Sequence, residues 1–247
     1  AALVGALPTH AGAWALRGEV LLCLGRYDDA REAVKEALGL DPKHVPSQLV
    51  RLRLARATGR HPTARAAEDF FFGLYREVKE LSAAELTAIG EAAGREDPHG
   101  AWKAFQEAHT QDPLYVPAYI RAGFHCLEFF AWDKARSEFE KALGIWPLCP
   151  DARAGYGALA VAKGEYEEAA ERLAGALEVN CRHELALQQQ AILYGIGGDY
   201  AEGLQVVDSA LGTQPQRLLL LAVQASLLDG LGRDAERDGA LERLTQA

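Results

Sequence analysis

Apolar residues recur along this chain at intervals of three and four positions, with polar residues between them, a pattern that predicts α-helices. The stretch Tyr166 to Val179 shows this pattern, because four of its apolar residues fall on one face of a helix: Ala169, Leu173, Ala176 and Leu177. Glycine and proline interrupt the pattern at short intervals, so the helices are short and come in pairs. We therefore expect an all-α protein built from helical hairpins.

A similar phrase returns along the chain. "GRYDDAREAVKEALGLDP" begins at Gly25, "GEYEEAAERLAGALEVN" at Gly164 and "GDYAEGLQVVDSALGTQP" at Gly198. The last two starts are 34 residues apart, and the first two are 139 residues apart, which is four such periods plus three. A fixed period of this length is typical of stacked repeats. The predicted repeats are residues 11–44, 45–81, 82–115, 116–149, 150–183, 184–217 and 218–247, after the tail of a preceding repeat at 1–10.

The three extra residues are placed in "RAAEDFFFGLYREVKELS", where the match to the repeat is weakest. They should lengthen the second helix of the second repeat, roughly Thr63 to Leu81, by about one turn. "SAAE" at Ser82–Glu85 predicts a capping box that opens the third repeat. Proline supports the register, because it disrupts helix interiors. All ten prolines fall at predicted edges: Pro8, Pro42, Pro46, Pro62, Pro98, Pro113, Pro117, Pro147, Pro150 and Pro215.

The positions shared by the repeats carry a family resemblance. The first repeat resembles the tetratricopeptide repeat pattern through Trp14, Gly18, Tyr27, Ala30, Ala37 and Pro42. The fourth repeat resembles it through Tyr119, Gly123, Ala135, Phe139, Ala142 and Pro147. The small residues of the pattern lie where helices cross closely, and a larger side chain would push the helices apart. The resemblance covers nearly the whole chain and implies a right-handed α-solenoid of helix–turn–helix repeats.

Charge and composition narrow the function classes. The 247 residues carry a net charge of −9, and residues 82–247 hold 14 basic and 25 acidic side chains. This part should repel nucleic acid phosphates and anionic membrane surfaces, so no nucleic acid partner is expected. No apolar run approaches the roughly 20 residues that span a bilayer, so membrane insertion is not expected either.

The beginning of the chain, "AALVGALPTH", has no signal-peptide pattern, and the sequence contains no methionine. Because the array also begins inside a repeat, we interpret the chain as a fragment of a larger protein. Because no signal-peptide pattern is present, we interpret its location as cytoplasmic. The cysteines are scattered without a metal-binding spacing, which is typical of reduced thiols. They are Cys23, Cys126, Cys149 and Cys181.

No catalytic or phosphate-binding motif is found, so we predict no enzyme activity, no catalytic residue and no cofactor. His10, His44 and His183 share one position just before a first helix. A metal-ligand set is one interpretation. Neighbouring helices lie about 8–10 Å apart, too far for one ion whose bonds are about 2.1 Å long. Loop or capping roles are therefore favoured, and no metal ligand is predicted.

Arginines are dense in the second repeat. Arg53, Arg56 and Arg60 are spaced three and four apart, hence on one helical face. This face is interpreted either as solvated or paired with Glu19, one repeat earlier, or as an anion-binding patch at one end of a groove.

Two further groups have a structural interpretation and a ligand-binding alternative. Phe129, Phe130 and Trp132 lie around the turn between two helices, where packing is favoured over a cofactor site. Gln190 and Gln224 are one period apart in a usually apolar position. A hydrogen bond between them or to the backbone is favoured over a ligand contact.

The resemblance implies that the first helices line a concave surface that captures a peptide, a helix or a protein partner without a reaction. We therefore predict a non-catalytic protein–protein interaction scaffold whose ligand is apolar or amphipathic. Cover by a terminal segment or by a second copy of the chain, hence self-association, remains an alternative. The predicted partner-binding residues are Arg53, Arg56, Leu86, Ile120, Phe124, Leu127, Ala158, Val161, Leu185, Gln188 and Ile192.

An enzyme-associated role is the alternative function. The array would then guide substrate to the catalytic domain of a multidomain peptidase or glycosyltransferase, and that domain would lie outside this chain. The glycosyltransferase version implies an asparagine ladder along the groove. The corresponding column contains no asparagine and reads Leu16, Val50, Thr87, Arg121, Gly155, Gln189 and Val223. This argues against the glycosyltransferase and leaves the peptidase open.

Overall fold

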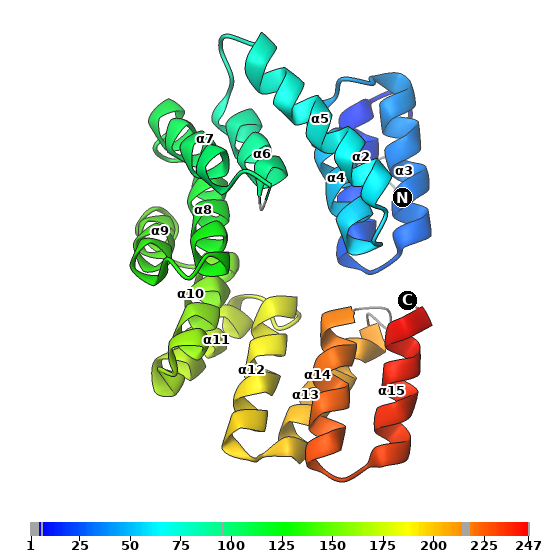
Figure 1. Cartoon of the computed structure of the whole chain (residues 1–247), viewed down its shortest axis with the longest axis vertical. Helices are drawn as coiled ribbons and strands as arrows, with labels where there is room; N and C mark the ends of the chain where they lie inside the picture. The colour runs from blue at the N-terminus through cyan, green and yellow to red at the C-terminus, as the bar shows by residue number, and fades with distance from the viewer. Residues whose placement is uncertain (1–4, 6, 95, 214–217, 247) are drawn as a thin grey trace. The chain divides into compact units, whose positions relative to one another are not determined.

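The computed structural model describes residues 5, 7–94, 96–213 and 218–246, and these residues form helices, turns and loops without a strand (Figure 1). The chain divides into two compact units, Ala1–Tyr115 and Val116–Ala247, which we call the N-terminal and C-terminal units. The N-terminal unit contains α2 (Ala11–Cys23), α3 (Tyr27–Leu40), α4 (Val45–Ala57), α5 (His61–Glu77), α6 (Ala83–Ala93) and α7 (Pro98–Gln111). The C-terminal unit contains α8 (Val116–Glu128), α9 (Trp132–Ile145), α10 (Pro150–Lys163), α11 (Tyr166–Val179), α12 (Glu184–Gly197), α13 (Tyr200–Thr213), α14 (Leu218–Gly230) and α15 (Asp234–Gln246).

Consecutive helices pair into hairpins, as the 34-residue period predicts. In the C-terminal unit, α8 packs on α9, α10 on α11, α12 on α13 and α14 on α15. The second helix of each hairpin also contacts the first helix of the next, as α9 contacts α10 and α11 contacts α12. The N-terminal unit repeats this arrangement with α2 to α7. The predicted all-α helical-repeat fold is therefore confirmed.

Helix ends follow local sequence signals. The predicted capping box is present at α6, where the Glu85 N–H donates to the Ser82 hydroxyl at 3.3 Å and the Ser82 N–H donates to the Glu85 carboxylate at 2.8 Å. At the other end of a hairpin's first helix, Gly164 closes α10 with φ of 77°. A side chain is disfavoured in this left-handed conformation, so glycine is the residue that ends the helix here.

The spacing between helices depends on small residues facing one large side chain. The Phe139 ring of α9 is fully buried between α8 and α10. A Cβ atom added to Gly123 or Gly155 would lie only 2.6 or 2.4 Å from this ring. Any larger residue at either glycine would therefore push the neighbouring helix away.

The irregular second repeat lengthens its second helix, as predicted. Helix α5 has 17 residues, whereas α7 has 14. It begins at His61 and ends at Glu77, so the predicted end at Leu81 is four residues too late. Of the three consecutive phenylalanines, Phe71 is fully buried and its neighbours are half-buried. One helix face cannot bury three consecutive side chains.

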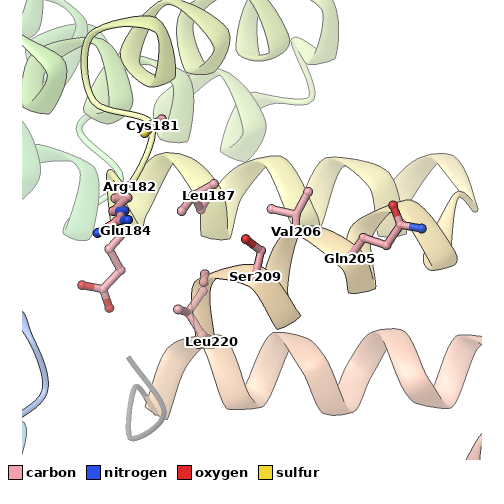
Figure 2. A pocket seen from close by; sticks show the side chains of 9 residues that line it. Cys181, Arg182, Glu184, Leu187, Gln205, Val206, Ser209 and Leu220 are labelled. Carbon is pink, nitrogen blue, oxygen red and sulfur yellow. The ribbon is translucent and has the colours of Figure 1, made fainter. Parts of the chain in front are cut away.

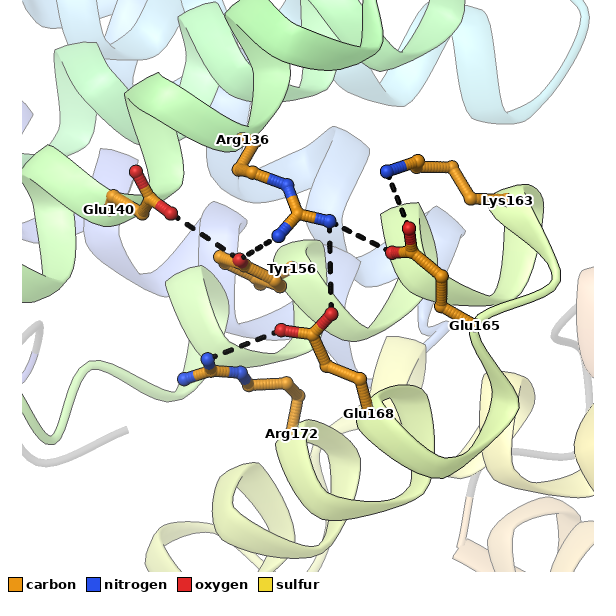
Figure 3. A network of polar contacts seen from close by, with 7 residues as sticks. All are labelled: Arg136, Glu140, Tyr156, Lys163, Glu165, Glu168 and Arg172. Atoms are coloured by element: carbon orange, nitrogen blue, oxygen red, sulfur yellow. Dashed lines mark hydrogen bonds and ion pairs between the residues drawn. The ribbon is translucent and has the colours of Figure 1, made fainter.

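A polar network joins three successive helices of the C-terminal unit around Tyr156 (Figure 3). The Arg136 guanidinium of α9 donates to the Tyr156 hydroxyl and to Glu165, each at 2.8 Å. The Arg172 guanidinium of α11 lies 4.4 Å from the centre of the Tyr156 ring. Glu168 lies between the two arginines, 3.7 Å from Arg136 and 3.4 Å from Arg172. This network ties α9, α10 and α11 together.

Gln190 and Gln224 were expected to bond to each other or to the backbone, whereas two hydrogen bonds of Gln224 are to charged side chains. Its amide nitrogen donates to Asp208 at 2.6 Å, and its amide oxygen accepts from Arg243 at 2.6 Å. The side chain thus connects α13, α14 and α15, because charged groups on the adjacent helices compete successfully for its amide.

Overpacking tests the buried alanine column. We expect Ala169→Leu to lower the free energy of unfolding by about 1–3 kcal/mol, because Ala169 is fully buried between helices. The matched control is Ala170→Leu on the exposed side of the same helix, which should change it by less than about 0.5 kcal/mol. Urea unfolding followed by circular dichroism measures both. Equal losses would show that α11 does not pack as described.

Candidate functional site

The first helices of successive hairpins lie against one another within each unit. In the N-terminal unit α4 contacts both α2 and α6, and in the C-terminal unit α10 contacts α8 and α12, which in turn contacts α14. The side chains that these helices turn away from their partner helices form what we call the first-helix surface. All the residues predicted to bind a partner belong to these helices.

Arg53 is engaged inside the N-terminal unit. Its guanidinium donates to both carboxylate oxygens of Glu91, at 2.6 and 2.7 Å, and to Glu19 at 2.6 Å. Burial alone would lower the pKa of Arg53, but the hydrogen bond and charge of Glu91, together with the charge of Glu19, raise it. These contacts favour the pairing with Glu19 over an anion-binding patch.

Arg56 is also engaged. It donates to the backbone carbonyls of Glu91 at 2.9 Å and Ala92 at 2.8 Å, and to the Glu68 carboxylate at 2.9 Å. A cation that binds the last carbonyls of a helix is favourable there. Arg56 thus caps α6 and links it to α4 and α5, and its charge is already neutralised.

Three of the other predicted residues lie within the core. Leu86, Ile120 and Ala158 are all less than a tenth exposed, because each packs against a neighbouring helix. Phe124 is half-buried, with its ring packed edge-on against Phe139 at 5.3 Å between centres. These side chains shape the surface more than they present area to a partner.

The remaining predicted residues are half-buried and present part of their area to solvent. They are Leu127, Val161, Leu185, Gln188 and Ile192. Val161 and Leu185 pack on a cluster around Leu173 and Ala186, so their inner sides are fixed. The structure brings Leu185, Gln188 and Ile192 together along α12.

Two exposed apolar residues extend this part of the surface and were missed. Ile196 is 49% exposed and lies one turn after Ile192 on α12. Leu219 is 61% exposed at the start of α14, one 34-residue period after Leu185. The helical and repeat spacings were sufficient to find both residues.

An apolar stripe also runs along α2 to its C-cap residue. Leu16, Val20 and Leu24 follow one another at four-residue spacing and are about half exposed. One period later, Val50 and Leu54 are buried against α2 and α3 in one apolar cluster. The equivalent positions of α4 thus pack against the preceding hairpin.

The aromatic residues between α8 and α9 lie around the turn, as predicted. Their interpretation as packing residues is wrong for Phe130, whose side chain is 74% exposed. Phe129 is also exposed, and only Trp132 is half-buried.

A separate pocket of about 400 Å³ lies in the C-terminal unit (Figure 2). Leu187, Val206 and Leu220 form its apolar wall. Arg182 lies in the turn before α12, and Glu184 is the first residue of that helix. The pocket shares no lining residue with the predicted partner-binding set.

The three aligned histidines all stand at helix N-caps. His183 Nδ1 accepts a hydrogen bond from the Ala186 N–H at 3.3 Å, and its Nε2 lies 3.1 Å from Asp151. The hydrogen bond between the His183 ring and the Asp151 carboxylate lowers the pKa of Asp151. Among the described residues, no group of three or more His, Cys, Asp or Glu side chains could hold a metal ion. No helix in the described ranges is long and apolar enough to cross a membrane.

The architecture described above is that of a helical-repeat protein. Family models described as tetratricopeptide repeat match residues 11–44 and residues 127–188, one match in each unit. These matches identify tetratricopeptide repeats in both units of the chain. No curated protein gave a significant match.

Solved structures show the same fold at low sequence identity. A tetratricopeptide repeat protein from Parabacteroides merdae ATCC 43184 matches with 18% identity and a TM-score of 0.56, over 96% of this chain and 79% of that one. Yeast Tom70 matches with 16% identity and a TM-score of 0.65, over 96% of this chain and 50% of that one. A chain of the APC/C hetero-tetramer Cut9–Hcn1 matches with 15% identity and a TM-score of 0.59, over 92% and 44%. The chain thus spans about half the length of the last two.

Removal of the Arg53 guanidinium should destabilise the N-terminal unit. We expect Arg53→Met to lower the free energy of unfolding by about 1–3 kcal/mol, because it removes a bidentate cationic partner from the partly buried Glu91. Arg65→Met, at an exposed arginine of α5, should have little effect. Thermal unfolding measures both changes, and equal shifts would contradict a structural role for Arg53.

Cysteine reactivity tests the burial pattern. Burial raises the pKa of Cys126 to about 11 and also raises that of Cys149, so neither thiol should react in the folded protein. Cys23 and Cys181 are exposed and should react with iodoacetamide at pH 8. Mass spectrometry of peptides distinguishes the four sites, and urea should expose all of them. Rapid native modification of Cys149 would contradict the packing of α10.

Proposed function

We propose that this chain is a non-catalytic scaffold that binds an amphipathic helix of a protein partner on the first-helix surface of its C-terminal unit. The observation that carries the proposal is the run of solvent-accessible apolar side chains on two adjacent first helices, Leu185, Ile192 and Ile196 on α12 and Leu219 on α14. Exposed apolar patches of this kind are typical of interaction sites.

The dimensions of the run fit a helix. Leu185 and Ile196 are eleven residues apart on α12, which corresponds to about 16 Å, or roughly three turns of a partner helix. A partner helix that lays its apolar face along such a surface contributes anchors at three- and four-residue spacing. Gln188 lies in the middle of the run and offers a hydrogen bond that fixes the partner's register.

Two considerations support a protein partner. Tetratricopeptide repeats supply extended surfaces for protein interaction, and one of the similar structures is a hetero-tetramer of Cut9 with Hcn1. Arg53 and Arg56 are left out of the proposed site, because carboxylates and carbonyls of their own unit already occupy both guanidinium groups. The partner therefore needs no acidic flank to pair with them.

Introduction of a negative charge into the apolar run tests the site. Ile196→Asp and Leu219→Asp should each reduce partner recovery from a lysate of the source organism at least about tenfold, because a carboxylate would be buried at the interface. Ile196 is about half exposed and Leu219 is more so, and circular dichroism should therefore show unchanged folding. Quantitative mass spectrometry measures the recovered proteins.

The control is Leu148→Asp, at an apolar residue that is 56% exposed on the α9–α10 turn. It should leave partner recovery unchanged. Unchanged recovery with both site variants would contradict the proposal. Conversion of a dimer to a monomer by these variants, seen by size-exclusion chromatography, would show that a second copy of the chain occupies the surface instead.

A further inference from the structure

The turn between α8 and α9 holds a phenylalanine where equivalent turns hold glycine. Phe130 stands two residues before α9 with φ of 57°, and its N–H donates to the Leu127 carbonyl while the next N–H donates to Cys126. Five other turns place a residue with positive φ two positions before the second helix of the hairpin. All five are glycines: Gly25, Gly59, Gly164, Gly198 and Gly232.

The backbone conformation of Phe130 lowers the free energy of unfolding, and the packing of its ring does not offset this loss. The left-handed conformation is unfavourable for a residue with a Cβ atom. Burial of the ring would offset that cost, but the Phe130 side chain is 74% exposed, the largest value among the exposed large apolar residues of the described chain. Unfavourable backbone conformations of this kind cluster at active sites, ligand clamps and switch regions.

Phe130 and its neighbours form an aromatic cluster in which Phe129 and Phe130 are exposed and His125 and Trp132 are half-buried. The Trp132 ring lies 6.2 Å from the Phe130 ring, and the Phe129 ring lies 4.9 Å from that of His125. Two exposed acidic residues flank the cluster, Glu128 at the end of α8 and Asp133 in the first turn of α9, and the exposed Lys134 follows Asp133. Residues 116–247 as a whole hold 12 basic and 19 acidic side chains.

We propose that this turn is a second docking surface, for a protein segment in which apolar residues alternate with arginine or lysine. A partner cation can stack on the Phe130 or Trp132 ring, for which about 6 Å between charge and ring centre suffices. The same cation can approach the Asp133 carboxylate, and the negative field of the unit attracts it from solution. An acidic segment would be repelled. This surface is separate from the run of apolar residues on α12 and α14.

The variant Phe130→Gly separates binding from folding. It should keep or raise the melting temperature, by up to about 4 °C, because glycine adopts the turn conformation without strain. The probe is a short fluorescein-labelled peptide of leucine and arginine, with a matched peptide in which glutamate replaces arginine. Fluorescence polarisation should show that the wild type prefers the arginine peptide, and that Phe130→Gly weakens its binding about three- to tenfold.

Two control variants place the probe on this turn. Leu148→Ser removes an exposed apolar residue from the other turn of the same repeat, and Ile196→Asp disrupts the proposed helix-binding surface. Both should bind the arginine peptide like the wild type. If Ile196→Asp alone weakens binding, the peptide occupies the α12 surface and the inference about the turn is overturned, while the proposed function stands.

Other outcomes would also overturn the inference. Equal binding of the arginine peptide by the wild type and Phe130→Gly would do so, as would equal affinity of the wild type for the two peptides or no binding of either. Phosphatidylcholine vesicles that retain the wild type but not Phe130→Gly, with no peptide binding, would assign the turn to a lipid surface instead.

Discussion

The close approach of first helices to a large side chain from the second helix is the constraint on which this structure depends. Phe139 fills the space between α8 and α10 only because Gly123 and Gly155 leave room for its ring. Phe105 occupies the same kind of space against Gly90. One ring thus fixes the distance between neighbouring first helices. The positions available to a partner are those that these helices turn away from the ring.

Charged side chains contribute to the same stacking. Arg53 joins α2, α4 and α6 through Glu19 and Glu91, and Arg136 joins α9 to α10 and α11 through Tyr156 and the adjacent carboxylates. A row of arginines on one helix face can therefore be an internal link between repeats. Apolar residues such as Leu219, whose outer sides no neighbouring helix covers, are better indicators of a binding surface here.

The sequence predicts the features of this structure that depend on neighbouring residues. The period, the capping box at Ser82 and the extra turn in α5 follow from local conformational preferences, and all three are observed. The partners of Arg56 and Gln224 could not be predicted, because long side chains choose among several groups that only the packed helices bring within reach. The unusual turn at Phe130 could have been found in the sequence, since the 34-residue step back from Gly164 reaches a phenylalanine instead of a glycine.

The side-chain links described between hairpins have a short range. Arg53 reaches 34 residues back to Glu19 and 38 residues forward to Glu91, which is about one period in either direction. Stability in such an array is close to a sum over hairpins and the contacts between neighbours. A perturbation at one hairpin then decays as it passes each interface. Two ligands bound several hairpins apart would therefore hardly influence each other's affinity, and the chain would hold them as independent cargoes.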